Sequence, residues 1–122
     1  MKFQLNMRES IVSGMKEENL INKLAPKEAP KLNIIILTKK LEIMNTLTVM
    51  ETYLLGQEGK KVLLIDFDPQ GNATEIMKET YKADLKPELS LYEGLLEGNL
   101  SKSIVSVTNQ IDMIPTDWTL SL

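Results

Sequence analysis

Two carboxylates, Asp66 and Asp68, follow directly on one of the two longest apolar runs of the chain, Val62–Ile65. Such a run indicates a strand buried on both faces, as in a parallel sheet covered by helices. Ligands of open α/β sheets bind at the carboxyl ends of strands. One carboxylate could hold Mg²⁺ through its waters, and the other could position or deprotonate an attacking water. The alternative is a solvated strand end that leads into a tight turn over 68–71.

The elements around this strand predict one βαβ unit. A strand is expected over 32–37, a helix over 43–58 and the second strand over 61–67. Gly59 is placed as a C-cap glycine would be. The apolar positions of the helix are spaced i, i+4, i+7 and i+11, which predicts that they form its core-facing stripe. These positions are Ile43, Leu47, Met50 and Leu54.

Further along, Asn72 and Ser90 each precede a glutamate by three residues, which is the capping-box pattern. Two short helices are therefore expected, over 73–81 and 90–97. A core strand stopped by Pro115 is expected over 111–114. Residues 104–107 read as a short strand or a turn, and a further helix is expected to begin at about residue 117.

The start of the chain has a different pattern. Residues 7–24 carry apolar side chains at helical spacing, and the two prolines at 26 and 30 then break any helix. The sequence therefore divides into an N-terminal helix with a Pro-containing linker, 1–31, and an α/β portion, 32–122. The helix could bind a partner or cover the sheet, and both alternatives stay open.

The amino-acid composition excludes several kinds of catalytic and metal-binding site. The chain has 122 residues, enough for one domain, and neither cysteine nor histidine. Disulfides, thiolate metal sites and imidazole catalysis are thus excluded. No apolar run approaches the roughly 20 residues of a membrane span, and the first residues lack an export signal, so we expect a cytoplasmic protein without membrane contact.

Charge is distributed unevenly. Residues 62–122 carry four Lys/Arg against ten Asp/Glu, whereas residues 1–31 carry six against four. Recognition of a phosphate backbone needs clustered basic side chains on one surface. Direct binding of nucleic acid is therefore not expected.

The run VLLIDFDPQGNAT, which begins at Val62, closely resembles the segment that follows the first helix of ParA/Soj chromosome and plasmid partitioning ATPases. These proteins belong to the deviant Walker A P-loop ATPases, with MinD. Further stretches are similar to the family's first strand, the end of its first helix, its next helix and its next strand. They are Asn33–Leu37, Tyr53–Lys61, Leu89–Leu96 and Ile111–Pro115.

The resemblance implies a partial three-layer P-loop NTPase-like fold with a mostly parallel sheet, and it implies ATP and Mg²⁺ as the family's cofactors. By resemblance, Asp68 takes the water-activating, catalytic position. Lys39, Thr46, Asp66 and Gln70 take cofactor-binding positions, and Asp66 and Thr46 those associated with Mg²⁺.

The loop between the first strand and helix departs from the family. Where the family has a KGGVGKTT-type loop, this chain has KKLEIMNT from Lys39 to Thr46. The three glycines are gone, Met44 replaces the phosphate-binding lysine, and Glu42 adds negative charge. Each lost charge-assisted phosphate contact costs about 1.5–3 kcal/mol, so we expect no tight binding of ATP.

Three functions follow from this pattern. The chain is a ParA-like partition protein impaired in nucleotide binding, a non-catalytic module that pairs with ParA-like homologues, or a truncated remnant. Homo- or heterodimers with a ParA-like protein, and a ParB-type centromere-binding partner, are implied by the resemblance.

Overall fold

The computed structural model describes residues 6–8, 21–38, 42–68 and 70–116. Within these ranges the chain forms one five-stranded sheet in the order β1-β2-β3-β5-β4. The four strands β1, β2, β3 and β5 run parallel, and β4 is antiparallel to β5. The strands are β1 (Asn6–Arg8), β2 (Ile34–Thr38), β3 (Val62–Asp66), β4 (Val105–Ser106) and β5 (Ile111–Ile114).

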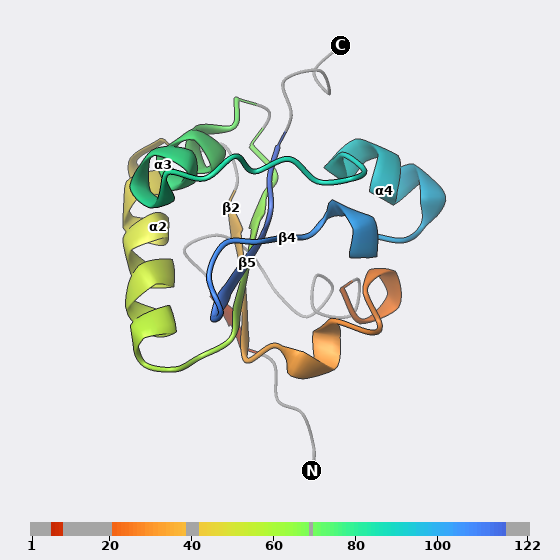
Figure 1. Cartoon of the computed structure of the whole chain (residues 1–122), viewed down its shortest axis with the longest axis horizontal. Coiled ribbons are helices and arrows are strands. Elements are labelled where there is room, and N and C mark those ends of the chain that lie inside the picture. Colours follow the sequence, from red (N-terminus) through yellow and green to blue (C-terminus); the bar gives the residue numbers. More distant parts are fainter. Residues whose placement is uncertain (1–5, 9–20, 39–41, 69, 117–122) are drawn as a thin grey trace.

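Helices cover both faces of the sheet (Figure 1), which gives the three layers expected from the sequence. On one side lie α2 (Glu42–Gln57) and α3 (Asn72–Tyr81). On the other lie α4 (Leu91–Glu97) and the segment that contains the 3₁₀ turn η1 (Ala29–Lys31). A second 3₁₀ turn, η2 (Ser101–Ser103), follows α4. The predicted α/β class and the mostly parallel sheet are confirmed.

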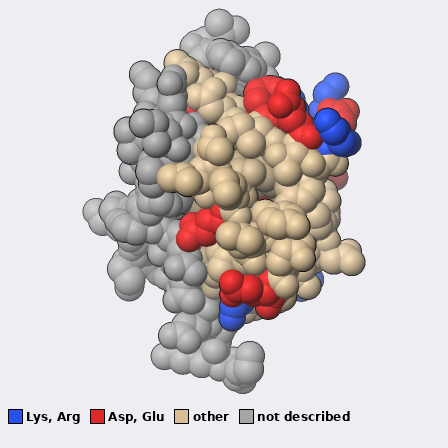
Figure 2. Space-filling view, turned by 90° about the vertical axis from the view of Figure 1, so that its left-hand side faces the viewer, with Lys and Arg blue, Asp and Glu red and all other residues tan. Residues whose placement is uncertain are grey.

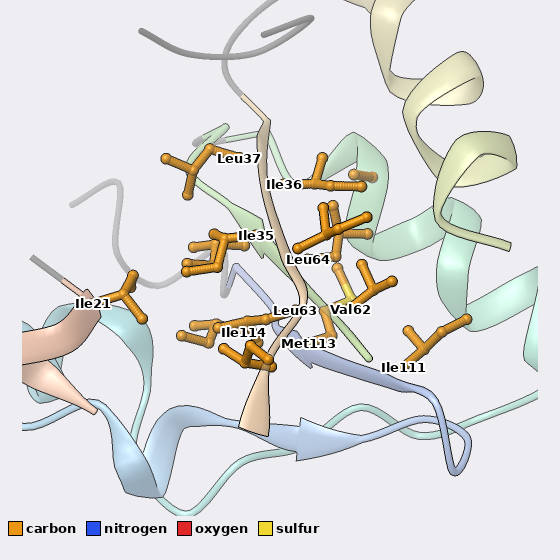
Figure 3. Packing of buried hydrophobic residues seen from close by; sticks show 14 of the residues in the cluster. Ile21, Ile35, Ile36, Leu37, Val62, Leu63, Leu64, Ile111, Met113 and Ile114 are labelled. Carbon is orange, nitrogen blue, oxygen red and sulfur yellow. The ribbon is translucent and has the colours of Figure 1, made fainter. Parts of the chain in front are cut away.

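The central strands β2 and β3 are buried along their whole length. Their side chains alternate between the two faces, as successive residues of a strand must. Ile36, Leu64 and Met113 point towards α2 and α3, while other side chains of the same strands point towards Ile21 on the far side (Figure 3). Two apolar layers therefore form on one sheet, and the continuous apolar runs of the sequence supply both.

The beginning of the chain corrects the predicted N-terminal helix. Residues Asn6–Arg8 form β1 and pair in parallel with β2, so a helix that starts at residue 7 is wrong. Residues 21–24 are helical, and 9–20 lie outside the described residues. The division at residue 31 stays a prediction, although Ile21, Ala25 and Ala29 pack in the same core as the strands.

The orientation of α2 also differs from the prediction. Leu47, Met50 and Leu54, expected to face the core, are exposed, whereas Val49, Thr52 and Leu55 are buried. The predicted bounds of the helix were nearly right, but its apolar stripe was assigned to the wrong face. The side chain of Ile43 lies outside the part of the structure that can be described.

Of the two predicted capping boxes, one is confirmed. The Ser90 hydroxyl accepts a hydrogen bond from the Glu93 N–H at 3.1 Å, and the Glu93 carboxylate accepts one from the Ser90 N–H at 3.0 Å. The box at Asn72 is wrong, because Asn72 is already inside α3 and Gly71, at φ 66°, is the N-cap. Glycine reaches this left-handed backbone conformation without strain.

The short strands after α4 appear where residues 104–107 and 111–114 predicted them. The helix expected from residue 117 lies outside the described residues. None of the helices formed by described residues has the length and apolar content needed to cross a bilayer.

The helix α4 packs closely against the segment that follows it, and a substitution of Gly94 tests this packing. A Cβ at this position would lie 2.5 Å from Ser103 Oγ and 2.8 Å from Leu100 Cδ2. Gly94→Ala should therefore lower the free energy of unfolding by about 1–3 kcal/mol, as overpacking does. Urea denaturation measures the change.

Gly56→Ala in α2 is the matched control. Its Cβ would meet only the side chains of Ile111, at 3.1 Å, and Gln110. The gain in helix propensity of up to about 1 kcal/mol should offset this contact. Equal losses in both variants would contradict the assigned packing of α4.

Candidate functional site

Asp66, the last residue of β3, is fully buried and accepts four hydrogen bonds. Its Oδ1 accepts from the Thr38 hydroxyl and from the Asp68 N–H, each at 2.9 Å. Its Oδ2 accepts from the Thr74 N–H at 2.9 Å and from the Thr74 hydroxyl at 2.6 Å. A carboxylate has about four lone-pair positions, so this set of donors fills them.

The fold explains why these donors meet. Thr38 is the register partner of Asp66 across the parallel pair β2–β3, so both strands end at one edge of the sheet. The turn after β3 returns the chain as α3, whose first turn brings Thr74 to the carboxylate. The Thr74 hydroxyl accepts a hydrogen bond from the Thr116 N–H at 3.0 Å, and the Thr116 hydroxyl donates to the Asp66 carbonyl oxygen.

Asp68 organises the turn between β3 and α3. Its Oδ1 accepts from the Gln70 N–H at 3.0 Å, its Oδ2 from the Asn72 amide at 3.3 Å, and its carbonyl oxygen from the Gly71 N–H at 2.9 Å. The tight turn over 68–71 is thus present. The alternative of a solvated strand end is wrong, however, because Asp66 and Asp68 are both buried.

Burial raises the pKa of Asp66 above its ordinary value of 3.8, because a buried carboxylate loses its hydration. The hydrogen bonds from Thr74, Asp68 and Thr38 oppose this rise, since they stabilise the charged form. Desolvation is the larger effect. The position therefore combines a costly buried charge with a complete set of donors.

The other predicted site residues are either exposed or lie outside the described residues. Thr46 and Gln70 are exposed, and Lys39 lies outside the described residues. The structure brings Asp66, Asp68 and the backbone of Gln70 together through hydrogen bonds. The roles assigned to all five residues by resemblance stay predictions.

Mg²⁺ takes oxygen ligands in octahedral geometry and retains several of its waters. Asp66 offers no oxygen without a donor, and within the described ranges no three acidic side chains gather around one point. In this arrangement the described residues do not fit the ion.

A pocket of about 320 Å³ lies next to the site, between α3, α4 and the end of β5. Its charged side chains are of both signs: Glu75, Lys78, Lys86, Glu88 and Glu93. A triphosphate would meet more carboxylates than ammonium groups here, so the pocket does not resemble a phosphate cradle.

Sequence reasoning missed Thr38, Thr74 and Thr116. Only the strand register and the turn after β3 bring these three threonines to Asp66, and they are 28, 8 and 50 residues away in sequence. The available signal was a threonine just after two of the apolar strands, directly after Leu37 in β2 and two residues after Ile114 in β5.

Removing the Thr74 hydroxyl should disturb this hydrogen-bond network. Thr74→Val takes one donor from Asp66 and leaves the Thr116 N–H without its acceptor. We expect the free energy of unfolding to fall by about 1–3 kcal/mol, the cost of a buried unsatisfied group. Thr80→Val, at an exposed position of the same helix, should change it by less than about 0.5 kcal/mol. Equal effects would show that the network contributes nothing.

The raised pKa of Asp66 predicts how stability depends on pH. The folded chain binds this proton more tightly than the unfolded chain, so the contribution is fully present below pH 3.8 and is lost as pH rises through the raised pKa. Asp66→Asn cannot titrate here. Wild type should therefore lose stability relative to Asp66→Asn as pH rises from about 4 towards 7, measured by urea denaturation at each pH. A difference that stays constant or changes in favour of wild type would contradict the raised pKa.

Comparison with known proteins places the chain in a family. No curated protein matches it. A family model described as an AAA domain, AAA_31, matches residues 43–122, more than half of the chain. The match begins near the start of α2 and includes Asp66, Asp68 and the strand β5. The chain therefore belongs to the AAA_31 family of AAA domains, and its domain is of the P-loop NTPase kind.

Proposed function

We propose that this chain is a ParA-like partition protein whose nucleotide binding is impaired, so that it acts through contacts with other proteins. The AAA-domain match supports the P-loop ATPase kind. The segment from Val62 to Thr74, with its two aspartates at the carboxyl end of a parallel strand, supports the partition branch by resemblance.

The observation that carries the proposal is the state of Asp66. For this carboxylate to receive a water of Mg²⁺, at least one of its four donors must leave. Hydrogen bonds to a charged group contribute about 1.5–3 kcal/mol each, so this exchange opposes binding. It would also loosen the connection between β2, β3 and α3.

The segment from Lys39 to Thr46 adds to this cost. It has no glycine, and from Glu42 onward it belongs to α2, so its backbone N–H groups lack the freedom to wrap a phosphate. By resemblance, Met44 stands where the family has its phosphate-binding lysine, and Glu42 adds negative charge beside it. The family match begins only at residue 43, after the first four of these eight residues.

The proposal assigns partners by family resemblance. The chain would pair with a second copy or with a ParA-like homologue, and a ParB-type centromere-binding protein would act with that complex. Direct contact with nucleic acid is not part of the proposal, since residues 62–122 are strongly acidic.

A second candidate is an ATPase that retains the family's activity. The burial of Asp66 and Asp68 at the carboxyl end of β3, where α/β proteins bind ligands, favours it. In that case Asp68 would activate the attacking water. Lys39, Thr46, Asp66 and Gln70 would contact ATP and Mg²⁺, with Asp66 and Thr46 nearest the ion.

Calorimetric titration with ATP and Mg²⁺ separates the two, with a thermal melt to show that the chain is folded. We expect a cooperative melt and no binding at micromolar ATP. Replacing residues 39–46 by KGGVGKTT is the positive control, because it restores the glycines and the lysine. Micromolar binding by the wild-type chain would overturn the impairment and favour the ATPase.

A further inference from the structure

A second pocket lies at the opposite end of the sheet from Asp66. It has a volume of about 260 Å³ and lies between the C-terminal ends of α2 and α3 and the turn that joins β4 to β5. Ile111, which lines it, is the register partner of Val62, the first residue of β3, whereas Asp66 is the last. The pocket is therefore separate from the candidate functional site. We call it the tyrosine pocket, after two of the residues that line it.

The two tyrosines come from different helices. Tyr53 of α2 is 45% exposed, whereas the hydroxyl of Tyr81, at the end of α3, is buried and has no hydrogen-bond partner among the described residues. Burial raises the pKa of Tyr81 above its ordinary value of 10.0, and the nearby Tyr53 adds to this rise. Buried polar groups of folded proteins almost always have a partner. A bound molecule that brings a donor or an acceptor would supply one for this hydroxyl.

Three side-chain amides also line the tyrosine pocket. Gln57 ends α2, and Asn109 and Gln110 belong to the turn between β4 and β5. Within the described ranges none of the three amides makes a hydrogen bond. Each amide presents a donor and an acceptor side by side. This is the arrangement with which asparagine and glutamine recognise the edge of a nucleobase.

The turn that carries two of these amides is held in place by hydrogen bonds. Thr108 Oγ1 accepts from the Gln110 N–H at 3.1 Å, and the Asn109 carbonyl oxygen accepts from Lys61 Nζ at 3.1 Å. The Gln110 carbonyl oxygen accepts from the Val62 N–H at 2.8 Å, which connects the turn to β3. The amides thus project from a fixed backbone, and this reduces the entropy lost on binding.

Charge restricts the kind of ligand. None of the described residues that line the tyrosine pocket is charged. The Lys61 ammonium group, which reaches the Asn109 carbonyl oxygen, is already paired with Asp112 at 3.3 Å. The side of the molecule on which α2 lies is also mostly uncharged where it is described (Figure 2). A phosphate or a carboxylate would find no cation among the lining residues, so the part of the ligand that enters the pocket is uncharged.

Size and shape restrict the ligand further. Pockets for drug-sized molecules measure about 300–1,000 Å³, so a pocket of about 260 Å³ suits a smaller molecule. Aromatic side chains bind planar rings by stacking, and hydrogen bonds to the polar edge of the ring then identify it. A nucleobase has both a stacking face and a polar edge. An aliphatic ligand would bury the amides without partners, which is costly.

We propose that the tyrosine pocket binds the base of a free nucleoside. The ring stacks on Tyr53, its polar edge pairs with the side-chain amides, and one of its polar atoms reaches the Tyr81 hydroxyl. The proposal is independent of the proposed function, because it needs neither phosphate nor Mg²⁺. None of its residues belongs to the segment 39–46 or to the hydrogen-bond network of Asp66.

Nuclear magnetic resonance of the ¹⁵N-labelled full chain tests it. The probes are adenosine, guanosine, cytidine and uridine in buffer without Mg²⁺. At least one should shift the side-chain NH₂ signals of Asn109 and Gln110 and the backbone signals of residues 108–111. The expected Kd is roughly 0.1 mM, which is ordinary for a ligand of about 20 heavy atoms. Ribose, which has no base, should shift none of them.

Two variants test the assigned contacts. Tyr81→Phe removes only the hydroxyl, so the affinity should fall about two- to tenfold, as for one hydrogen bond. Its thermal melt should not fall, because the hydroxyl has no partner among the described residues. Tyr92→Phe in α4, at a 53% exposed position, is the matched control and should change neither quantity. Tyr53→Leu should weaken binding at least about fivefold, because it removes the stacking face.

Four results would overturn the proposal. They are no shift with any of the nucleosides, shifts confined to residues away from 108–111, equal affinities of wild type and Tyr81→Phe, and a lower melting temperature of Tyr81→Phe. The last would show that the hydroxyl is paired within the chain. All four leave the proposed function untouched, since that is tested with micromolar ATP and Mg²⁺.

Discussion

The arrangement of the sheet edge depends on one buried carboxylate. Asp66 is the point where β2, β3 and α3 meet, through hydrogen bonds from Thr38 and Thr74. Its carbonyl oxygen, by accepting from the Thr116 hydroxyl, adds the chain beyond β5. An isolated charge at this depth would be very costly, so the donors and the charge require one another. The hydrogen bonds to Asp66 therefore also hold the ends of β2 and α3, which supply the donors, in place.

Much of this architecture could be predicted from the sequence because it follows from local patterns. The apolar runs at 34–37 and 62–65 are long enough for buried strands and too short for buried helices, and both form strands. The helix between them, the capping box at Ser90 and the strand before Pro115 each rest on a few adjacent residues. The resemblance of the segment after β3 to P-loop ATPases agrees with the family to which the chain belongs.

What could not be predicted depends on contacts between distant residues. The face that α2 presents to the core was assigned from its apolar spacing, yet packing against β2 and β3 buries Thr48 and Thr52 instead. The donors of Asp66 depend on strand register and on the turn after β3. The strand β1 begins in a stretch with helical spacing, and its pairing with β2 supplies the hydrogen bonds that decide its conformation.

That pairing has a consequence for the behaviour of the chain in solution. Without β1, the strand β2 would expose one row of backbone N–H and C=O groups along the sequence IIILT. Open edges of flat, apolar, uncharged strands are where polypeptides add to one another and aggregate. The edges that remain belong to β1 and to the two-residue β4, which are short. By pairing with Ile34–Ile36, the three residues of β1 therefore protect most of β2 from intermolecular pairing.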